Sequence, residues 1–259
     1  MHASALYNLG FAAAVCVVCA VFVSSSAVSL RDRQAANEAL EKQRNVLVAA
    51  GLATNDERPE ADEIAARFES IRQVVIDLDT GAEVDGVNPD LFDQRAAAAG
   101  AETGRPAPEN MAGVQRLPRQ ALVYELRNAA GQLDLVILPI SGMGLWSTLY
   151  GFIAIDADLE TIRGLTYYEH AETPGLGGEV DNPRWKALWP GRKLFDSGET
   201  VSIEVIRGRA GAPEADPHRV DGLAGATMTS RGVTNMLHLW LGEHGFRPYL
   251  DRLRVRERM

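Results

Sequence analysis

The order of apolar and polar positions separates a continuous apolar stretch near the N-terminus from a longer region of mixed pattern. Residues 3–30 contain no charged side chain, and residues 9–23 are almost continuously apolar. Because about 20 helical residues cross the ~30 Å hydrocarbon core of a bilayer, we predict one transmembrane helix over residues 9–30, after a tail over 1–8. A cleaved signal peptide is the alternative, but residues 1–10 contain no Lys or Arg, so the basic leader of such a peptide is missing. We therefore expect a retained membrane anchor.

The region after the anchor, residues 31–116, is expected to be helical at first and irregular further on. No Pro and no Gly occurs in it before Gly51, and Ala, Leu, Glu, Gln and Lys are frequent, so a helix should continue to about residue 53. After a break at 55–62 we predict a second short helix, then a strand, then an irregular excursion. These three segments are expected at 61–68, 74–78 and 86–113.

Residues 117–259 are predicted to form a compact α+β domain with a central antiparallel sheet flanked by helices. Apolar or alternating runs indicate its strands, and the turn at 128–131 makes a hairpin of the first two. The strands are expected at 122–126, 135–140, 150–155, 162–168 and 201–206. A short helix is expected at 182–189, with Pro183 in its first turn. Apolar residues at helical spacing predict the closing helix over 229–244, and strands grouped together favour α+β over a doubly wound sheet.

Composition and charge exclude several classes of function. The formal net charge is −9 and the pI is near 5.1, so no nucleic-acid partner is expected, since its phosphates require a basic face. The two cysteines, Cys16 and Cys19, lie in the apolar stretch and cannot complete a metal site by themselves. The five histidines show no metal-ligand spacing, and no Ser-His-Asp or paired-carboxylate arrangement can be identified. We therefore expect no metal and no complete active site on this chain.

The segment 221–230 is a Gly-rich turn that presents three hydroxyls just before the predicted closing helix. The candidates for its N-cap are Thr227, Thr229 and Ser230. The free N–H groups and the positive dipole end of a helix start favour a phosphate. Gly225 and Ala226 have almost no side chain, which lets a ligand approach the backbone closely. An ordinary helix cap without a ligand is the alternative that this local chemistry leaves open.

Two other Gly-rich turns lack the complete signature of a nucleotide site. Residues 142–147 resemble a dinucleotide fingerprint in part, but Ser147 occupies the third Gly position and a strand follows, so no NADH site is predicted. Residues 172–179 lack the Gly-Lys-Ser/Thr ending of a phosphate-binding P-loop. Plain connecting loops are the alternative for both turns, with Trp146 of the first turn then an ordinary core side chain.

Three motifs together resemble one family of membrane subunits. They are Gly-Leu-Trp-Ser-Thr-Leu-Tyr-Gly-Phe at 144–152, Glu-Thr-Pro-Gly-Leu-Gly-Gly-Glu at 172–179 and Asp-Gly-Leu-Ala-Gly-Ala-Thr at 221–227. Their order and spacing resemble the C subunit of the sodium-translocating NADH:quinone reductase, as do the single anchor and the sequences at 49–52 and 182–185. The last motif is similar to the attachment sequence of covalent FMN-binding domains, although Ala224 stands where that family usually has Ser or Thr.

The resemblance implies an electron-relaying subunit that carries FMN covalently. The flavin would be joined through its phosphate to the hydroxyl of Thr227, with Gly225 and Ala226 beside the attachment point. Further contacts are expected from apolar side chains and from backbone groups at the ring edge. The apolar side chains are those of Leu145, Trp146 and Leu176, and the backbone groups are those of Gly144, Thr173 and Gly175.

The resemblance also implies partners and a location. Electrons would pass between redox centres during NADH oxidation, quinone (ubiquinone) reduction and sodium export in a six-subunit complex. A flavin transferase would attach FMN taken from FAD with Mg²⁺, and membrane lipid would surround the single-pass anchor. The family implies an FMN domain on the periplasmic side of the bacterial inner membrane. The basic residues after the anchor, Arg31, Arg33, Lys42 and Arg44, predict the opposite orientation under the positive-inside rule, and we follow the family.

Two alternatives remain from the sequence. The related G subunit of a ferredoxin-linked electron-transport complex has a similar flavin domain, but it is usually shorter between anchor and domain than the long segment 55–115 here. A membrane-anchored interaction module that uses the same fold without flavin is the other alternative.

Overall fold

The computed structural model describes residues 2–54, 57 and 59–258. Residues 55, 56 and 58 of the predicted break at 55–62, and Met1 of the predicted tail, lie outside the described residues. The chain divides into two compact units, residues 1–42 and residues 43–259.

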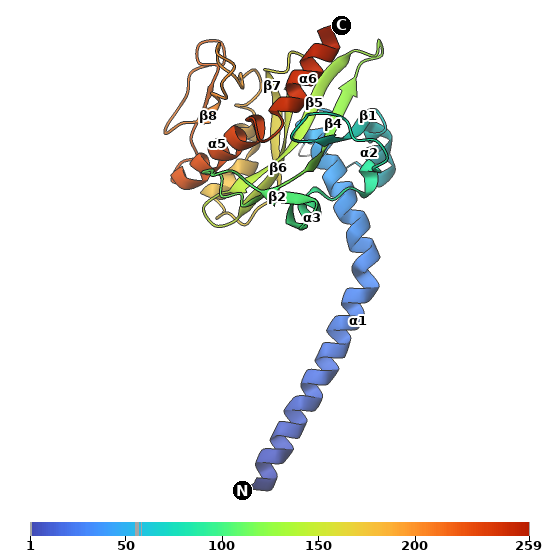
Figure 1. Ribbon diagram of the computed structural model, residues 1–259. Coiled ribbons are helices and arrows are strands. Elements are labelled where there is room, and N and C mark those ends of the chain that lie inside the picture. Colours follow the sequence, from blue (N-terminus) through green and yellow to red (C-terminus); the bar gives the residue numbers. More distant parts are fainter. Residues whose placement is uncertain (1, 55–56, 58, 259) are drawn as a thin grey trace. The chain divides into compact units, whose positions relative to one another are not determined.

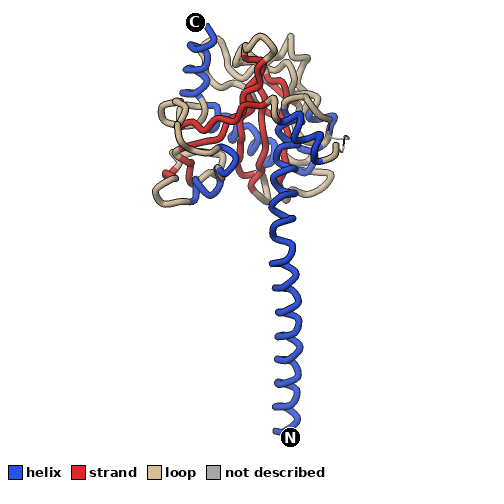
Figure 2. Tube along the Cα trace, turned by 90° about the vertical axis from the view of Figure 1, so that its right-hand side faces the viewer, coloured by secondary structure: helices blue, strands red, loops and turns tan. Residues whose placement is uncertain are grey.

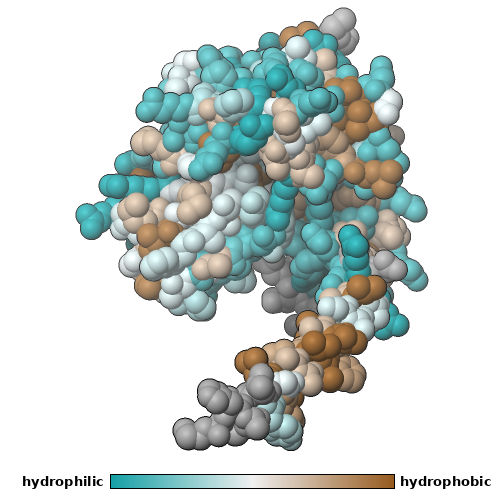
Figure 3. All heavy atoms as spheres, turned by 60° about the horizontal axis from the view of Figure 1, so that its bottom comes forward, coloured by the Kyte–Doolittle hydropathy of each residue, from teal (hydrophilic) through white to brown (hydrophobic). Residues whose placement is uncertain are grey.

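The first unit is most of helix α1 (His2–Ala49), the long helix coloured blue in Figure 1. Its window Tyr7–Arg31 has a mean hydropathy of 2.4, and none of that window is buried. Large apolar side chains such as Phe11 and Phe22 are exposed, and Figure 3 shows apolar atoms gathered along this helix. In the described residues it is the one helix long and apolar enough to cross a membrane. The predicted helices at 9–30 and 31–53 are therefore one continuous helix that ends at Ala49.

The second unit is built on a five-stranded antiparallel sheet, whose strands are red in Figure 2. Its strand order is β1-β4-β5-β6-β7, and the four strands from β4 to β7 follow one another as a meander. The strands are β1 (Ile71–Asp77), β4 (Gln120–Arg127), β5 (Leu133–Met143), β6 (Thr148–Asp156) and β7 (Ile162–Glu169). All five strands were predicted from their apolar runs, and each is longer than its prediction. The edge strand β1 pairs with β4, so residues before 117 contribute to the same sheet.

Helices cover both faces of this sheet (Figure 1). On one face, α5 (Thr227–Leu241) and α6 (Arg247–Arg258) bury Met236, Trp240 and Leu250 against residues such as Val123 and Ile153. On the other face, α2 (Ala61–Phe68) packs through an edge-to-face contact of Phe68 with Tyr124, whose ring centroids are 6.0 Å apart. The predicted α+β fold with a central antiparallel sheet flanked by helices is therefore confirmed.

The connections are short and mostly irregular. Besides the predicted helix at 61–68, which is α2, they contain α3 (Gln94–Ala99), α4 (Pro183–Lys186) and the 3₁₀ turns η1 (Pro89–Leu91) and η2 (Gly177–Asp181). Two small sheets pair β2 (Gly104–Pro106) with β3 (Arg116–Pro118), and β8 (Glu204–Val205) with β9 (Arg219–Val220). The predicted excursion at 86–113 thus holds a helix and a strand. The predicted helix at 182–189 is shorter, although Pro183 does occupy its first turn.

Two predicted elements have different bounds in the structure. The strand expected at 201–206 is reduced to Glu204–Val205, which pairs with the two-residue strand β9. On its other edge, the Val205 amide donates to the Thr234 hydroxyl of α5 at 2.9 Å. The helix expected at 229–244 begins earlier and ends at Leu241, where Gly242 and Gly245 turn the chain and the Phe246 amide bonds the Trp240 carbonyl at 2.6 Å. A separate helix, α6, then closes the domain.

Candidate functional site

The segment 221–230 is held in place on both sides of a short exposed stretch. At its start, the Asp221 carbonyl accepts from the Trp185 indole N–H at 2.9 Å, and the Asp221 carboxylate accepts from the Ala210 amide at 2.8 Å. Leu223 and Ala226 are buried, while Ala224, Gly225 and Thr227 are exposed. Gly225 has φ +73°, and a Cβ there would lie 2.9 Å from Leu176 Cδ2. This close approach brings the loop at 172–179 against the turn that precedes α5.

The three hydroxyls at the start of α5 have different surroundings. Thr229 Oγ1 donates to Glu172 Oε2 at 2.6 Å, and Ser230 Oγ accepts from the Leu223 amide at 3.1 Å; both residues are buried. Thr227 is exposed, and its hydroxyl makes no hydrogen bond with residues 2–54, 57 and 59–258. The N-cap position belongs to Ala226, without a side-chain cap bond, so the predicted capping role of the three hydroxyls is wrong. Thr229 and Ser230 do not cap the helix, because their hydroxyls bond to Glu172 and Leu223 instead.

Glu172 joins the three motifs of the sequence at one buried carboxylate. It is 5% exposed, and its Oε1 accepts from the amides of Trp146 at 2.8 Å and Ser147 at 3.2 Å. Its Oε2 accepts from Thr229. A Cβ on Gly177 would overlap that Oε2, so the loop passes directly against the carboxylate. One side chain therefore fixes the turn after β5, the loop after β7 and the first turn of α5.

The charge of Glu172 is stabilised by hydrogen bonds. Burial alone would raise the pKa of Glu172, but bonds from the Thr229 hydroxyl and from the backbone amides of residues 145–147 outweigh it. The pKa of Glu172 consequently lies below its usual value, and the carboxylate is ionised at neutral pH. The Glu172 amide in turn donates to His170 Nδ1 at 3.2 Å, while His170 Nε2 contacts Asp181 at 2.7 Å.

Several large apolar side chains near the start of α5 are exposed. Trp146 is 68% exposed, which is unusual for so large an apolar side chain, and it lies in the turn between β5 and β6 instead of in the core. The others on the same three segments are Leu145, Leu176 and Met228. Exposed apolar side chains gathered on adjoining segments are typical of a ligand or partner surface. The predicted apolar contacts are thus on the surface beside the segment that holds Thr227.

Of the backbone groups predicted to contact the flavin ring, two already make hydrogen bonds within their own loops. The Gly144 amide donates to the Ser147 carbonyl at 2.8 Å, so this amide closes its own turn. The Thr173 carbonyl accepts from the amides of Leu176 at 3.1 Å and Gly178 at 3.0 Å. Gly175 is exposed with φ +76° and open space around it. Its role as a ligand contact stays a prediction.

Glu172 is the site residue to which the sequence analysis gave no role. An acidic residue at the start of a Gly-rich loop is common on protein surfaces, so its type alone indicates nothing special. The signal that identifies it is spatial: residues 26 and 57 positions away in the chain bond to its two oxygens.

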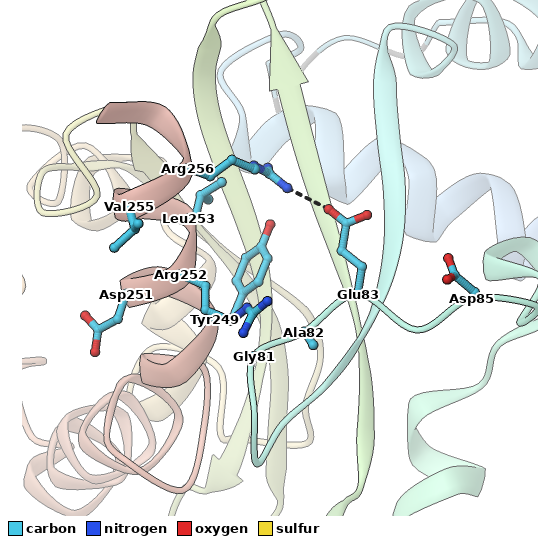
Figure 4. Close-up of a pocket in the computed structure, with 10 residues that line it drawn as sticks. All are labelled: Gly81, Ala82, Glu83, Asp85, Tyr249, Asp251, Arg252, Leu253, Val255 and Arg256. Atoms are coloured by element: carbon cyan, nitrogen blue, oxygen red, sulfur yellow. Dashed lines mark hydrogen bonds and ion pairs between the residues drawn. The ribbon is translucent and has the colours of Figure 1, made fainter. Parts of the chain in front are cut away.

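A separate pocket lies between the segment 81–85 and α6 (Figure 4). Its wall includes Glu83, Tyr249 and Arg256, and the Arg256 guanidinium pairs with Glu83 at 2.6 Å. None of the predicted flavin contacts lines it. No group of three or more potential metal ligands occurs in the part of the chain that the structure describes.

Comparison with known proteins gives consistent matches over nearly the whole chain. The family model of the FMN-binding domain matches residues 144–242, which contain all three motifs. The C subunit of the Na⁺-translocating NADH-quinone reductase of Pseudomonas aeruginosa is 46% identical over 247 residues, which are 94% of this chain and 94% of that protein. The C subunit of the same enzyme from Yersinia pestis is 44% identical over 93% of this chain and 90% of its own length.

Two solved structures are similar as well. NqrC of Shewanella oneidensis superposes with a TM-score of 0.77 and 36% identity, over 85% of this chain and 99% of that one. The C subunit of the Na⁺-translocating NADH-quinone reductase of Parabacteroides distasonis gives a TM-score of 0.65 with 29% identity, over 85% of this chain and 96% of that one.

Proposed function

Since this chain belongs to the family of the C subunit of the Na⁺-translocating NADH-quinone reductase, we propose that it holds FMN by a phosphoester to Thr227 and relays electrons in the membrane complex. Its FMN-binding domain places it among the flavoprotein subunits of this oxidoreductase. The flavin supplies the redox chemistry when bound, and the protein holds and tunes it. NADH oxidation, ubiquinone reduction and sodium export are then activities of the whole complex.

The exposure of Thr227 is the observation that carries this proposal. Of the three hydroxyls at the start of α5, Thr229 and Ser230 are buried and hydrogen-bonded, whereas Thr227 is exposed. A phosphoryl group on Thr227 would displace no hydrogen bond that its hydroxyl makes with the described residues. It would also lie at the N-terminal end of the α5 dipole, where a negative charge is stabilised.

The surroundings of Thr227 fit a flavin and an external attachment enzyme. The exposed side chains of Leu145, Trp146 and Leu176 offer an apolar surface for a planar ring, with small residues Gly225 and Ala226 next to the acceptor. A threonine hydroxyl is a weak nucleophile unless a base activates it. Within the described residues no carboxylate or histidine bonds to Thr227, so we infer that a flavin transferase supplies that base.

We further propose that α1 anchors the domain in the inner membrane by a single pass, with the FMN domain on the periplasmic side. The apolar window Tyr7–Arg31 supports the anchor, because its exposed side chains require a hydrocarbon surrounding. Membrane lipid and the other subunits of the complex would be its partners. The ferredoxin-linked G-type alternative and the flavin-free module are not favoured, because the relatives matching 93–94% of this chain are C subunits.

The attachment can be tested by producing the full chain together with a flavin transferase and FAD. We expect flavin fluorescence at the band of this chain on a denaturing gel, and mass spectrometry should locate FMN on the peptide that contains Thr227. Thr227→Val should abolish the fluorescence, while Thr227→Ser keeps the hydroxyl and should retain it. Covalent flavin on the Thr227→Val chain would refute the assignment.

A further inference from the structure

We propose, on the basis of the function proposed above, that Glu172 is a positioning residue whose uncompensated negative charge lowers the midpoint potential of the flavin on Thr227. Its carboxylate binds the turn at 144–147 and the start of α5 at once. Two properties support this role. The carboxylate has no counter-ion among the described residues, and it bonds to the segments that carry the residues assigned to the flavin.

The missing counter-ion is clear from a comparison of two buried acids. Glu125 and Glu172 are the buried acidic side chains in the described part of the chain. Arginines surround the Glu125 carboxylate, with Arg256 at 2.7 Å, Arg127 at 3.1 Å and Arg72 at 3.4 Å. No Lys, Arg or His forms an ion pair with Glu172 among residues 2–54, 57 and 59–258. The Glu172 charge is therefore held by N–H and O–H dipoles alone.

The hydrogen-bond donors keep the Glu172 carboxylate ionised, but they carry no net positive charge and so do not neutralise it. Hydrogen bonds from Thr229 and from the backbone of residues 145–147 outweigh the effect of burial, so the pKa of Glu172 is lowered. The backbone donors are fixed by the fold, so they stay directed at the carboxylate. The site thus contains a permanent negative charge at neutral pH.

The position of this charge makes it relevant to the flavin. Leu145 and Trp146, assigned to the ring, carry their side chains on the same turn whose amides bond to Glu172. The acceptor Thr227 is two residues from Thr229, which bonds to the other carboxylate oxygen. The negative charge of Glu172 disfavours electrons arriving on a flavin held by these residues, and because the carboxylate is buried its field is screened less than in water. Glu172 itself gains neither an electron nor a proton in the reduction.

The test is a redox titration of the full flavin-loaded chain in detergent, with dithionite as the reductant and the flavin absorbance followed against the measured potential. Glu172→Gln keeps the shape and the acceptor oxygen but removes the charge. We expect the one-electron reduction equilibrium to shift at least tenfold toward reduced flavin, which is about 59 mV upward for one electron. Glu169→Gln is the matched control, because Glu169 is exposed and paired with Arg95 at 2.7 Å. Its potential should equal that of the wild type.

A purely structural role for Glu172 predicts another result. In that case Glu172→Gln would lower flavin loading or thermal stability and leave the potential unchanged, and the proposal would be overturned. Glu172→Asp separates the two roles further, since it keeps the charge and shortens the side chain. We expect it to lose stability while its potential stays nearer to the wild type than that of Glu172→Gln.

A measurement on the wild type covers the case in which Glu172→Gln does not load flavin. Redox-difference infrared spectra of the chain with ¹³C-labelled glutamate carboxyls should show one ionised carboxylate band that moves on reduction. A spectrum without any glutamate band would refute the proposal. A wild-type chain without covalent flavin would instead refute the proposed function, and with it this role of Glu172.

Discussion

Gly177 lies against the Glu172 carboxylate and the Thr229 hydroxyl in the loop that follows β7. A Cβ at this position would overlap Glu172 Oε2 and come 2.6 Å from Thr229 Oγ1. Contacts this short force the buried groups apart, so Gly177→Ala should lower the free energy of unfolding by about 1–3 kcal/mol. It should also reduce the fraction of chains that carry flavin, because the turn at 144–147 and the start of α5 lose their common anchor.

Chemical denaturation and denaturing-gel fluorescence measure these two effects. Gly198→Ala is a suitable control, since Gly198 is exposed and its nearest neighbour, Asp196 Oδ1, lies at 3.3 Å from the added Cβ. Its stability should stay within about 0.5 kcal/mol of the wild type. Equal effects of the two substitutions would contradict the tight packing at Gly177.

At the same scale, sequence reasoning singled out Thr227 but not Glu172, whose carboxylate joins the three motifs. Thr227 could be singled out because its motif resembles an attachment sequence. The roles of Thr229 and Ser230 could not, since their hydroxyls bond to Glu172 and Leu223 instead of capping α5. Such bonds depend on residues up to 57 positions apart, which no local pattern encodes.

Among the elements, α6 is fixed to the sheet by the Glu125 cluster. Tyr249 Oη donates to Glu125 Oε1 at 2.8 Å, and Arg256 pairs with the same carboxylate at 2.7 Å. Burial would raise the pKa of Glu125, but the bonds from Arg256 and Tyr249 outweigh burial and lower it from 4.5. Glu125 therefore stabilises the fold above about pH 4.5, and this contribution is lost as the pH falls through the lower folded pKa.

Glu125→Gln should consequently destabilise the protein at pH 7 and lose much of this effect in acid. We expect a cost of roughly 1–3 kcal/mol at pH 7, less than for a fully buried pair because the arginines are partly exposed. The measurement is the free energy of unfolding of both proteins between pH 7 and pH 3. Glu160→Gln, at an exposed position, should match the wild type throughout. A difference that stays constant with pH would show that the Glu125 charge is not the cause.

Elements with a regular apolar pattern could be predicted, and those that depend on tertiary contacts could not. The strands β4 to β7 have long apolar runs that indicate their positions to within a few residues. Five of the twelve residues of α6 are arginine, and its apolar face consists of Tyr249, Leu250 and Leu253, so its pattern is weaker than the long apolar runs of the strands. The segment 201–206 alternates as a strand does, yet only Glu204–Val205 forms a strand, and the Val205 amide donates to the Thr234 hydroxyl of α5.

For the whole molecule, the sequence predicted the anchor but supplied conflicting evidence for its orientation. The length and hydropathy of the apolar stretch agree with the window Tyr7–Arg31. Basic residues after that window favour a cytoplasmic domain, whereas the family implies a periplasmic one. The positive-inside rule is a statistical tendency, so the orientation calls for a direct measurement.

Cysteine labelling decides between the two orientations, because the native Cys16 and Cys19 lie inside the apolar window and should react little with a membrane-impermeant maleimide. Ala130→Cys places a thiol in the exposed turn between β4 and β5, and Ser4→Cys places one ahead of the apolar window. For a periplasmic domain, Ala130→Cys should be labelled in intact spheroplasts and Ser4→Cys only after permeabilisation. The opposite pattern would put the domain in the cytoplasm. The cytoplasm contains free FMN that could replace a lost flavin, whereas the periplasm does not. A covalent link at Thr227 prevents loss of the flavin, so it would bring little advantage to a cytoplasmic domain.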